Sequence, residues 1–325
     1  MDLKPSIRCR HPIHSGLALR LALAIALASP AAGQRVPVEV LIENRFNAGE
    51  GLCFNGEGRL FVGANRAVWE ITPEGEARKL AEFTSNLGMA PIGERDLLKA
   101  DFGPLVFPQH GPNHDGVVYR LTPEGDTTTV ASGIGDPNAI VVLPDRSFLV
   151  SDDFTHFIYQ VTPAGTVSVF TEAIPFPNGL ALSPDAGVLY VARIFRRAPD
   201  LPAPARFQDF SDEVWRLPLR NCRPAASPEV IFRTGGESGP DGLAVDGEGR
   251  IYLAAARAGQ LWRITPQSGK GELLVDELPG LASIAFGRGA FDHQSLYAMQ
   301  IRGGRVLRLQ VGARGAKLHL GGHGK

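Results

Sequence analysis

The sequence predicts an all-β protein, and more specifically a six-bladed β-propeller. One short strand pattern recurs six times along the chain, at intervals of 50, 40, 56, 47 and 45 residues. That spacing is typical of propeller blades and of no helical repeat. After the first 30 residues, short β-branched and aromatic runs are frequent and runs of helical period are scarce, which also favours strands.

The recurring pattern alternates apolar and polar positions, as expected of a strand that is exposed on one face. Several copies end in a Thr-Pro turn, such as the one after Ile71. The six copies are Val68–Ile71, Val118–Leu121, Ile158–Val161, Val214–Leu217, Leu261–Ile264 and Val306–Leu309.

Two continuous apolar runs precede most copies, most clearly Gly242–Val245 followed by Gly249–Leu253. Such runs are expected of strands that are buried on both faces. With one outer strand, each blade then has four antiparallel strands. In the degenerate second blade, residues 97–100 are the expected second strand.

An unpaired strand, residues 38–42, precedes the first blade. We expect it to pair with the last copy as the outer strand of blade six and so to close the ring. A β-sandwich is the alternative all-β fold, and six near-equal repeats argue against it.

Residues 1–33 are predicted to be a cleaved export signal, which leaves residues 34–325 as the propeller domain. Basic residues at 4, 8 and 10 precede the apolar run Leu21–Ala28, and small residues follow at 31–33. The apolar run is shorter than the ~20 residues of a membrane span. We therefore expect a secreted or periplasmic protein without a membrane span.

Composition excludes some partners. The 325 residues carry a net charge of −1, which favours neither nucleic acid nor an anionic membrane. After cleavage two cysteines remain, Cys53 and Cys222. Cys53 lies in an apolar strand and is expected to be a small buried hydrophobe, although a disulfide between the two is an alternative in an oxidising compartment. The expected oligomeric state is a monomer or a weak dimer.

Four oxygen-bearing side chains stand at one phase of the repeat, directly before the first inner strand of their blades. These residues are Glu50, Asn138, Asn178 and Asp241. The rotation from blade to blade should bring them to one level around the central axis. Pro-Asn-Gly and Pro-Asp-Gly are also common turn tripeptides, but the shared phase favours a site over four unrelated turns.

Two carboxylates and two amides form a set of hard oxygen donors, which suits one divalent metal ion, Ca²⁺ above all. Mg²⁺, Mn²⁺ and Zn²⁺ are alternatives. No thiolate or imidazole spacing of a structural zinc site is present in the sequence.

The segments Gly49–Gly51, Pro177–Asp185 and Pro240–Asp246 resemble the SMP-30/gluconolactonase/LRE family, and the resemblance extends over about residues 40 to 310. It implies a six-bladed propeller that binds one divalent metal through Glu50, Asn178 and Asp241, with Asn138 lining the same site. Related calcium phosphotriesterases use a similar set of four residues, and members of the wider group hydrolyse lactones or organophosphates.

Two positions depart from the family pattern. Leu52 stands where the family usually has proline, and Asp136 stands where sugar-lactonase members carry arginine. The second departure argues against a sugar lactone as the substrate.

The resulting hypothesis is a metal-dependent hydrolase of small esters, most favourably a gluconolactonase-like lactonase. The metal would act as a Lewis acid, and Asp241 would act as general base or as nucleophile. Further pocket candidates are Asp136, the loop histidines His110 and His114, and Ser283, which we assign to the equivalent position of blade six. Asp152 and Asp153 are predicted to be turn or edge acids, with a position facing the channel as the alternative.

The main alternative is a binding module without chemistry, in which a structural calcium ion holds the blades together. A strictosidine-synthase-like propeller is a third possibility. It is disfavoured because the repeated oxygen ligands would then have no purpose.

Overall fold

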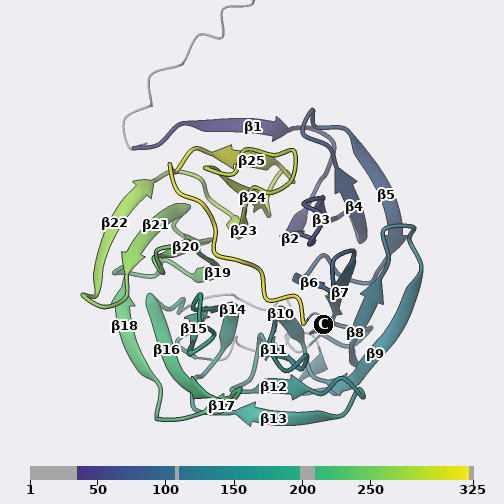
Figure 1. Ribbon diagram of the computed structural model, residues 1–325, viewed down its shortest axis with the longest axis vertical. Coiled ribbons are helices and arrows are strands. Elements are labelled where there is room, and N and C mark those ends of the chain that lie inside the picture. Colours follow the sequence, from purple (N-terminus) through teal and green to yellow (C-terminus); the bar gives the residue numbers. More distant parts are fainter. Residues whose placement is uncertain (1–34, 107–109, 198–208, 322–325) are drawn as a thin grey trace, which may run out of the picture.

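The computed structural model describes residues 35–106, 110–197 and 209–321. These residues form six antiparallel sheets around a central axis (Figure 1), so the predicted six-bladed β-propeller is confirmed. The predicted signal, residues 1–33, lies outside them. Within the described ranges, no helix has the length and apolar character needed to cross a membrane.

The first three blades follow chain order, each from the axis outward. Blade one consists of β2 (Gly49–Phe54), β3 (Leu60–Ala64), β4 (Ala67–Ile71) and β5 (Ala77–Glu82). Blade two consists of β6 (Met89–Ile92), β7 (Asp96–Asp101), β8 (Gly116–Leu121) and β9 (Thr127–Ile134). Blade three consists of β10 (Pro137–Val142), β11 (Phe148–Asp152), β12 (Ile158–Val161) and β13 (Val167–Thr171).

The other three blades contain an addition and the ring closure. Blade four consists of β14 (Pro177–Leu182), β15 (Val188–Arg193), β16 (Glu213–Arg220) and β18 (Glu229–Arg233), with the two-residue β17 (Arg223–Pro224) also paired to β16. Blade five consists of β19 (Pro240–Val245), β20 (Ile251–Ala255), β21 (Gln260–Thr265) and β22 (Lys270–Val275). Blade six consists of β23 (Leu281–Phe286), β24 (Leu296–Gln300), β25 (Val306–Leu309) and β1 (Val38–Ile42).

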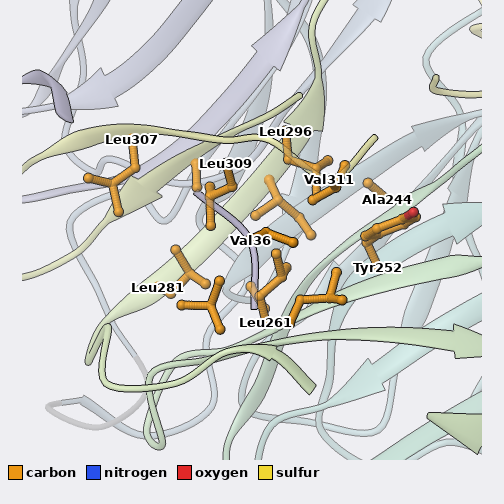
Figure 2. Close-up of a cluster of buried hydrophobic side chains, with 14 of the residues drawn as sticks. Val36, Ala244, Tyr252, Leu261, Leu281, Leu296, Leu307, Leu309 and Val311 are labelled. Atoms are coloured by element: carbon orange, nitrogen blue, oxygen red, sulfur yellow. The ribbon is translucent and has the colours of Figure 1, made fainter. Parts of the chain in front are cut away.

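The first strand closes the ring as predicted. β1 pairs antiparallel with β25, with Val38 opposite Leu309 and Glu39 opposite Arg308. Just before it, Val36 packs into the hydrophobic cluster between blades five and six, against residues such as Leu261 (Figure 2). The two ends of the propeller are therefore joined by strand pairing and by core packing.

The second strand of each blade is buried along most of its length, and β3 and β20 are buried at every position. This agrees with the continuous apolar runs, because neighbouring blades cover both faces. β7 confirms the second strand expected in blade two. At its centre, however, the fully buried Lys99 takes the place that Val62 and Val150 hold in other blades.

The C-terminal segment, residues 310–321, crosses the middle of the ring (Figure 1). It hydrogen-bonds to the ends of inner strands: the Ala316 N–H donates to the carbonyl of Val245, and the carbonyl of Leu320 accepts from the Gly93 N–H. It therefore covers the end of the channel opposite to the one where the inner strands begin. The repeat pattern does not predict this cover.

Both remaining cysteines are free thiols. Cys53 is buried in one hydrophobic cluster, and Cys222 packs at the edge of another. The structure therefore supports the buried hydrophobe predicted for Cys53 and does not contain the alternative disulfide.

Candidate functional site

The predicted site residues lie at the starts of inner strands, each within a β-bulge. In blade one, Gly49 pairs with Ala64 and Leu52 pairs with Val62, so that Glu50 and Gly51 together oppose one residue. The same irregularity occurs in β10, β14, β19 and β23. Bulges re-aim side chains and are common beside active sites.

The glycine after each of two site residues permits close packing around the axis. A Cβ on Gly179 would lie 1.9 Å from the carbonyl oxygen of Asp241, and one on Gly242 would lie 2.4 Å from that of Ala282. Pro-Asn-Gly and Pro-Asp-Gly are thus the beginnings of β14 and β19 rather than turns. The simple turn interpretation of these tripeptides is wrong.

The site residues are linked across blades by hydrogen bonds. The side-chain amide of Asn138 donates to Oε1 of Glu50 at 3.3 Å, and that of Asn178 donates to Oδ1 of Asp153 at 2.9 Å. Both asparagines are 4% exposed and Asp241 is 6% exposed, so these polar groups are held inside the channel. Because the amide nitrogens donate to carboxylates, the amide oxygens remain as acceptors.

Asp153 belongs to this site, although its sequence context favours a turn or edge acid. It follows β11, and it is 9% exposed. Besides the bond from Asn178, it interacts with Asn138 and with the charges of Glu50 and Asp136. One feature of the sequence points to it. Asp153 stands directly after the second strand of its blade, the position that Phe102 holds in blade two, and both residues line the same cavity.

Three carboxyl groups of the site have raised pKa values. Burial raises the pKa of Glu50, which Lys99 and Asn138 partly offset. Burial and the charge of Glu50 raise the pKa of Asp153 to about 8. Burial, followed by the charges of Glu50 and Asp153, raises the pKa of Asp241 well above its usual range. The three groups therefore oppose one another's ionisation.

Lys99 is the cationic side chain that acts on this group. Burial lowers its pKa to about 8, while Asp101 and Glu50 oppose that shift. Its ammonium group contacts the carbonyl oxygen of Ala100 and lies 5.4 Å from the ring centroid of Phe83. Because Lys99 acts on Glu50 and not on Asp153 or Asp241, excess negative charge remains when the three acids ionise.

This donor set fits a hard divalent cation. The ring offers carboxylate and amide oxygens from four blades, and the mutual repulsion of Glu50, Asp153 and Asp241 is the condition that a cation relieves. In the described part of the chain, no group of three or more His, Cys, Asp or Glu side chains is arranged as a metal site. The proposed ligand set differs from such a group because half of it is asparagine.

The other candidates lie elsewhere. Strand register shows that Ala282 is the blade-six equivalent of Asp241, so Ser283 is displaced by one residue and lines the channel toward the C-terminal segment. His110 and His114 are exposed, and neither lines the cavity at the site. Asp136 is buried and does not line that cavity, and Asn113 donates to its carboxylate at 3.2 Å.

A cavity of about 600 Å³ lies at the site. Glu50, Asp153, Asn178 and Asp241 all line it, which places their side-chain oxygens beside a space large enough for a small organic molecule. Its remaining walls come from the loops after second strands and from the segments that precede the inner strands of blades two and six. They are formed by Leu87, Phe102, Phe154, Ile194, Phe195, Phe210, Ala256, Arg257, Pro279, Gly280, Ile301 and Arg302.

Comparison with protein families identifies an SMP-30/Gluconolactonase/LRE-like region at residues 150–301, which confirms the family resemblance seen in the sequence. The matched segment includes Asn178 and Asp241 and ends before β25. No curated protein sequence matches this chain.

Solved structures share the fold at low sequence identity. Regucalcin from Agrobacterium tumefaciens, a calcium-binding protein, has a TM-score of 0.67 at 20% identity, over 89% of this chain and 98% of that one. A gluconolactonase from Xanthomonas campestris has a TM-score of 0.66 at 15% identity, over 86% and 95%. Virginiamycin B lyase from Staphylococcus aureus has a TM-score of 0.55 at 11% identity, over 84% and 99%. At these identities the likeness establishes the propeller fold alone.

Proposed function

The chain carries an SMP-30/gluconolactonase/LRE-like region, and we propose that it is a metal-dependent hydrolase of small esters, most favourably a lactonase. The observation that carries the proposal is the cavity at the start of the inner strands, which Glu50, Asn178 and Asp241 line together. These residues, with Asn138 as a further oxygen donor, would hold one divalent cation, and we favour Ca²⁺. When bound, such an ion supplies a Lewis acid that polarises an ester carbonyl.

The chain itself supplies the acid–base chemistry. A carboxylate that lines the cavity can act as a general base on water, and Asp241 is such a group. Its carboxylate oxygen would accept the proton of the attacking water, or would itself attack the carbonyl carbon. Asn178 and Asn138 position the neighbouring acids by donating hydrogen bonds to Asp153 and Glu50.

Chelation tests this proposal. Removing divalent metal with a chelator should reduce the hydrolysis of a simple lactone, such as dihydrocoumarin, to the uncatalysed rate, and adding Ca²⁺ should restore it. Far-UV circular dichroism should retain its β signature throughout, because strand pairing and core packing close the ring. Initial rates with each of Ca²⁺, Mg²⁺, Mn²⁺ and Zn²⁺ would identify the preferred ion.

Two other results would contradict the proposal. Turnover that a chelator leaves unchanged would exclude metal dependence. Tight Ca²⁺ binding that raises the melting temperature, without turnover of any lactone or aryl ester, would favour the binding module with a structural ion.

We also propose that the protein is exported and that the residues before position 34 are removed, as the basic and apolar N-terminal pattern indicates. After expression in a bacterial host, N-terminal sequencing of periplasmic protein should give a new end near residue 34. An intact Met1 in that fraction would contradict the prediction.

A further inference from the structure

The cavity has two chemically different walls, and both arise at one phase of the repeat. Four residues that line it stand two positions after the second strand of their blades. In blades three and four these are Phe154 and Phe195, and in blades five and six they are Arg257 and Arg302. At this position the cavity wall is therefore aromatic in blades three and four and cationic in blades five and six.

The aromatic wall is continuous across blades two to four. Ring centroids of Phe102 and Phe154 are 6.1 Å apart, those of Phe154 and Phe195 are 6.1 Å apart with a 16° interplanar angle, and those of Phe195 and Phe210 are 5.2 Å apart. Phe154 and Phe195 are held rigidly, at 5% and 4% exposure. Such a wall favours an apolar, ring-sized group over a polyhydroxylated sugar, because it offers no hydrogen-bond partners to the hydroxyl groups.

The cationic wall faces the cavity from blades five and six. Arg257 and Arg302 are exposed, and neither forms an ion pair with a carboxylate of the described residues. The guanidinium of Arg257 lies 5.9 Å from the ring centroid of Phe210, so it joins the end of the aromatic wall.

These arginines do not serve to neutralise the buried acids. The charged side chains that shift the pKa values of Glu50, Asp153 and Asp241 are one another, Asp136 and Lys99. Two guanidinium groups at a cavity, left without an ionic partner among the described residues, fit an anionic group on the ligand.

We propose that the substrate is a small ester or lactone that combines an apolar, ring-sized portion with an anionic group such as a carboxylate. The apolar portion lies against Phe154 and Phe195, the anionic group pairs with Arg257 and Arg302, and the scissile carbonyl lies over Glu50 and Asp241. This inference rests on the proposed ester hydrolysis, and it excludes neutral sugar lactones as preferred substrates.

A matched pair of esters tests the cationic wall, namely 4-acetoxybenzoate and its neutral methyl ester. Arg302→Met and Arg257→Met should each lower kcat/KM about ten-fold for the charged ester and less than about two-fold for the neutral one. The wild-type kcat/KM divided by the variant kcat/KM is compared between the two esters, and this comparison cancels the intrinsic reactivity of each ester. Arg66→Met is the matched control, since Arg66 stands at the same phase in blade one but does not line the cavity.

A pair of lactones tests the aromatic wall. The wild-type protein should hydrolyse dihydrocoumarin with a higher kcat/KM than δ-gluconolactone. Phe154→Leu and the less buried Phe210→Leu should reduce that kcat/KM about ten-fold for dihydrocoumarin and leave δ-gluconolactone within about two-fold. Thermal melts of both variants would show that the fold is retained.

Binding gives a readout that does not depend on catalysis. Calorimetric titration with 4-hydroxybenzoate, and with its methyl ester as the neutral partner, should show an affinity that Arg302→Met weakens about ten-fold for the charged ligand alone. If this selective binding occurs but no ester is hydrolysed, the substrate inference stands and the lactonase proposal fails. If hydrolysis is metal-dependent but δ-gluconolactone is preferred, or the arginine variants treat both esters alike, the substrate inference is overturned and the lactonase proposal stands.

Discussion

Asp241→Asn is expected to lower the rate of hydrolysis at least about a hundred-fold while the protein still binds the metal. The amide retains an oxygen that can coordinate a cation, but it can neither accept a proton from water nor attack a carbonyl. General acid–base catalysis typically contributes about 10²- to 10⁴-fold, so kcat should fall by that range. Initial rates on dihydrocoumarin beside a calorimetric Ca²⁺ titration would measure both properties in one preparation.

Glu50→Gln is the matched comparison, because it removes one charge from the same ring without removing the proposed base. It should weaken metal affinity, and saturating metal should restore most of the activity. The metal-free Asp241→Asn protein should also melt at a higher temperature than the metal-free wild type, since the charges of Glu50 and Asp153 oppose ionisation at Asp241. If Asp241→Asn turned over at the wild-type rate, the ring would be a structural site.

The stability of the metal-free protein should fall between pH 5 and pH 8, and Asp153 should account for much of that loss. The pKa of Asp153 is raised from 3.8 to about 8 by burial and by Glu50. Between these values the folded state retains a proton that the unfolded state releases, so each step up in pH favours unfolding. With about 1.4 kcal/mol for each pKa unit, the contribution over this interval is up to about 4 kcal/mol.

Urea unfolding of the metal-free protein at pH 5, 6.5 and 8 would measure this slope. Asp153→Asn should flatten the slope, and Ca²⁺ should raise stability more at pH 8 than at pH 5, because the ion binds the ionised carboxylates. Asp185→Asn is a control, because Asp185 is an exposed acid beyond the end of β14 and lies away from the site. Its carboxylate accepts a hydrogen bond from Ser183. A stability that rises from pH 5 to pH 8 in the metal-free protein would contradict the raised pKa.

The repeat made the arrangement of the blades predictable. Six copies of one strand pattern determine the blade count, and the unmatched strand at 38–42 determines how the ring closes. The repeat also selects the four site residues, because residues at the same position of each repeat lie at the same level along the propeller axis. These residues are Glu50, Asn138, Asn178 and Asp241. Strand register places all four at equivalent positions.

The phase of blade six could not be read in this way. Its apolar run has no Asn-Gly or Asp-Gly to mark the start, so the sequence predicts Ser283 at this position, and the strand register shows that Ala282 occupies it. A bulge adds a residue on one strand only, so the length of an apolar run does not fix which side chain faces the axis.

The sequence by itself determined the propeller, its closure and the oxygen ring, because these follow from periodicity and from residue type. Only the tertiary structure showed that Asp153 joins the ring, that Phe154 and Arg302 stand on one cavity, and that the C-terminal segment covers the opposite end of the channel. These features depend on contacts between segments far apart in the chain and on the burial that shifts pKa values, and neither is encoded in local pattern.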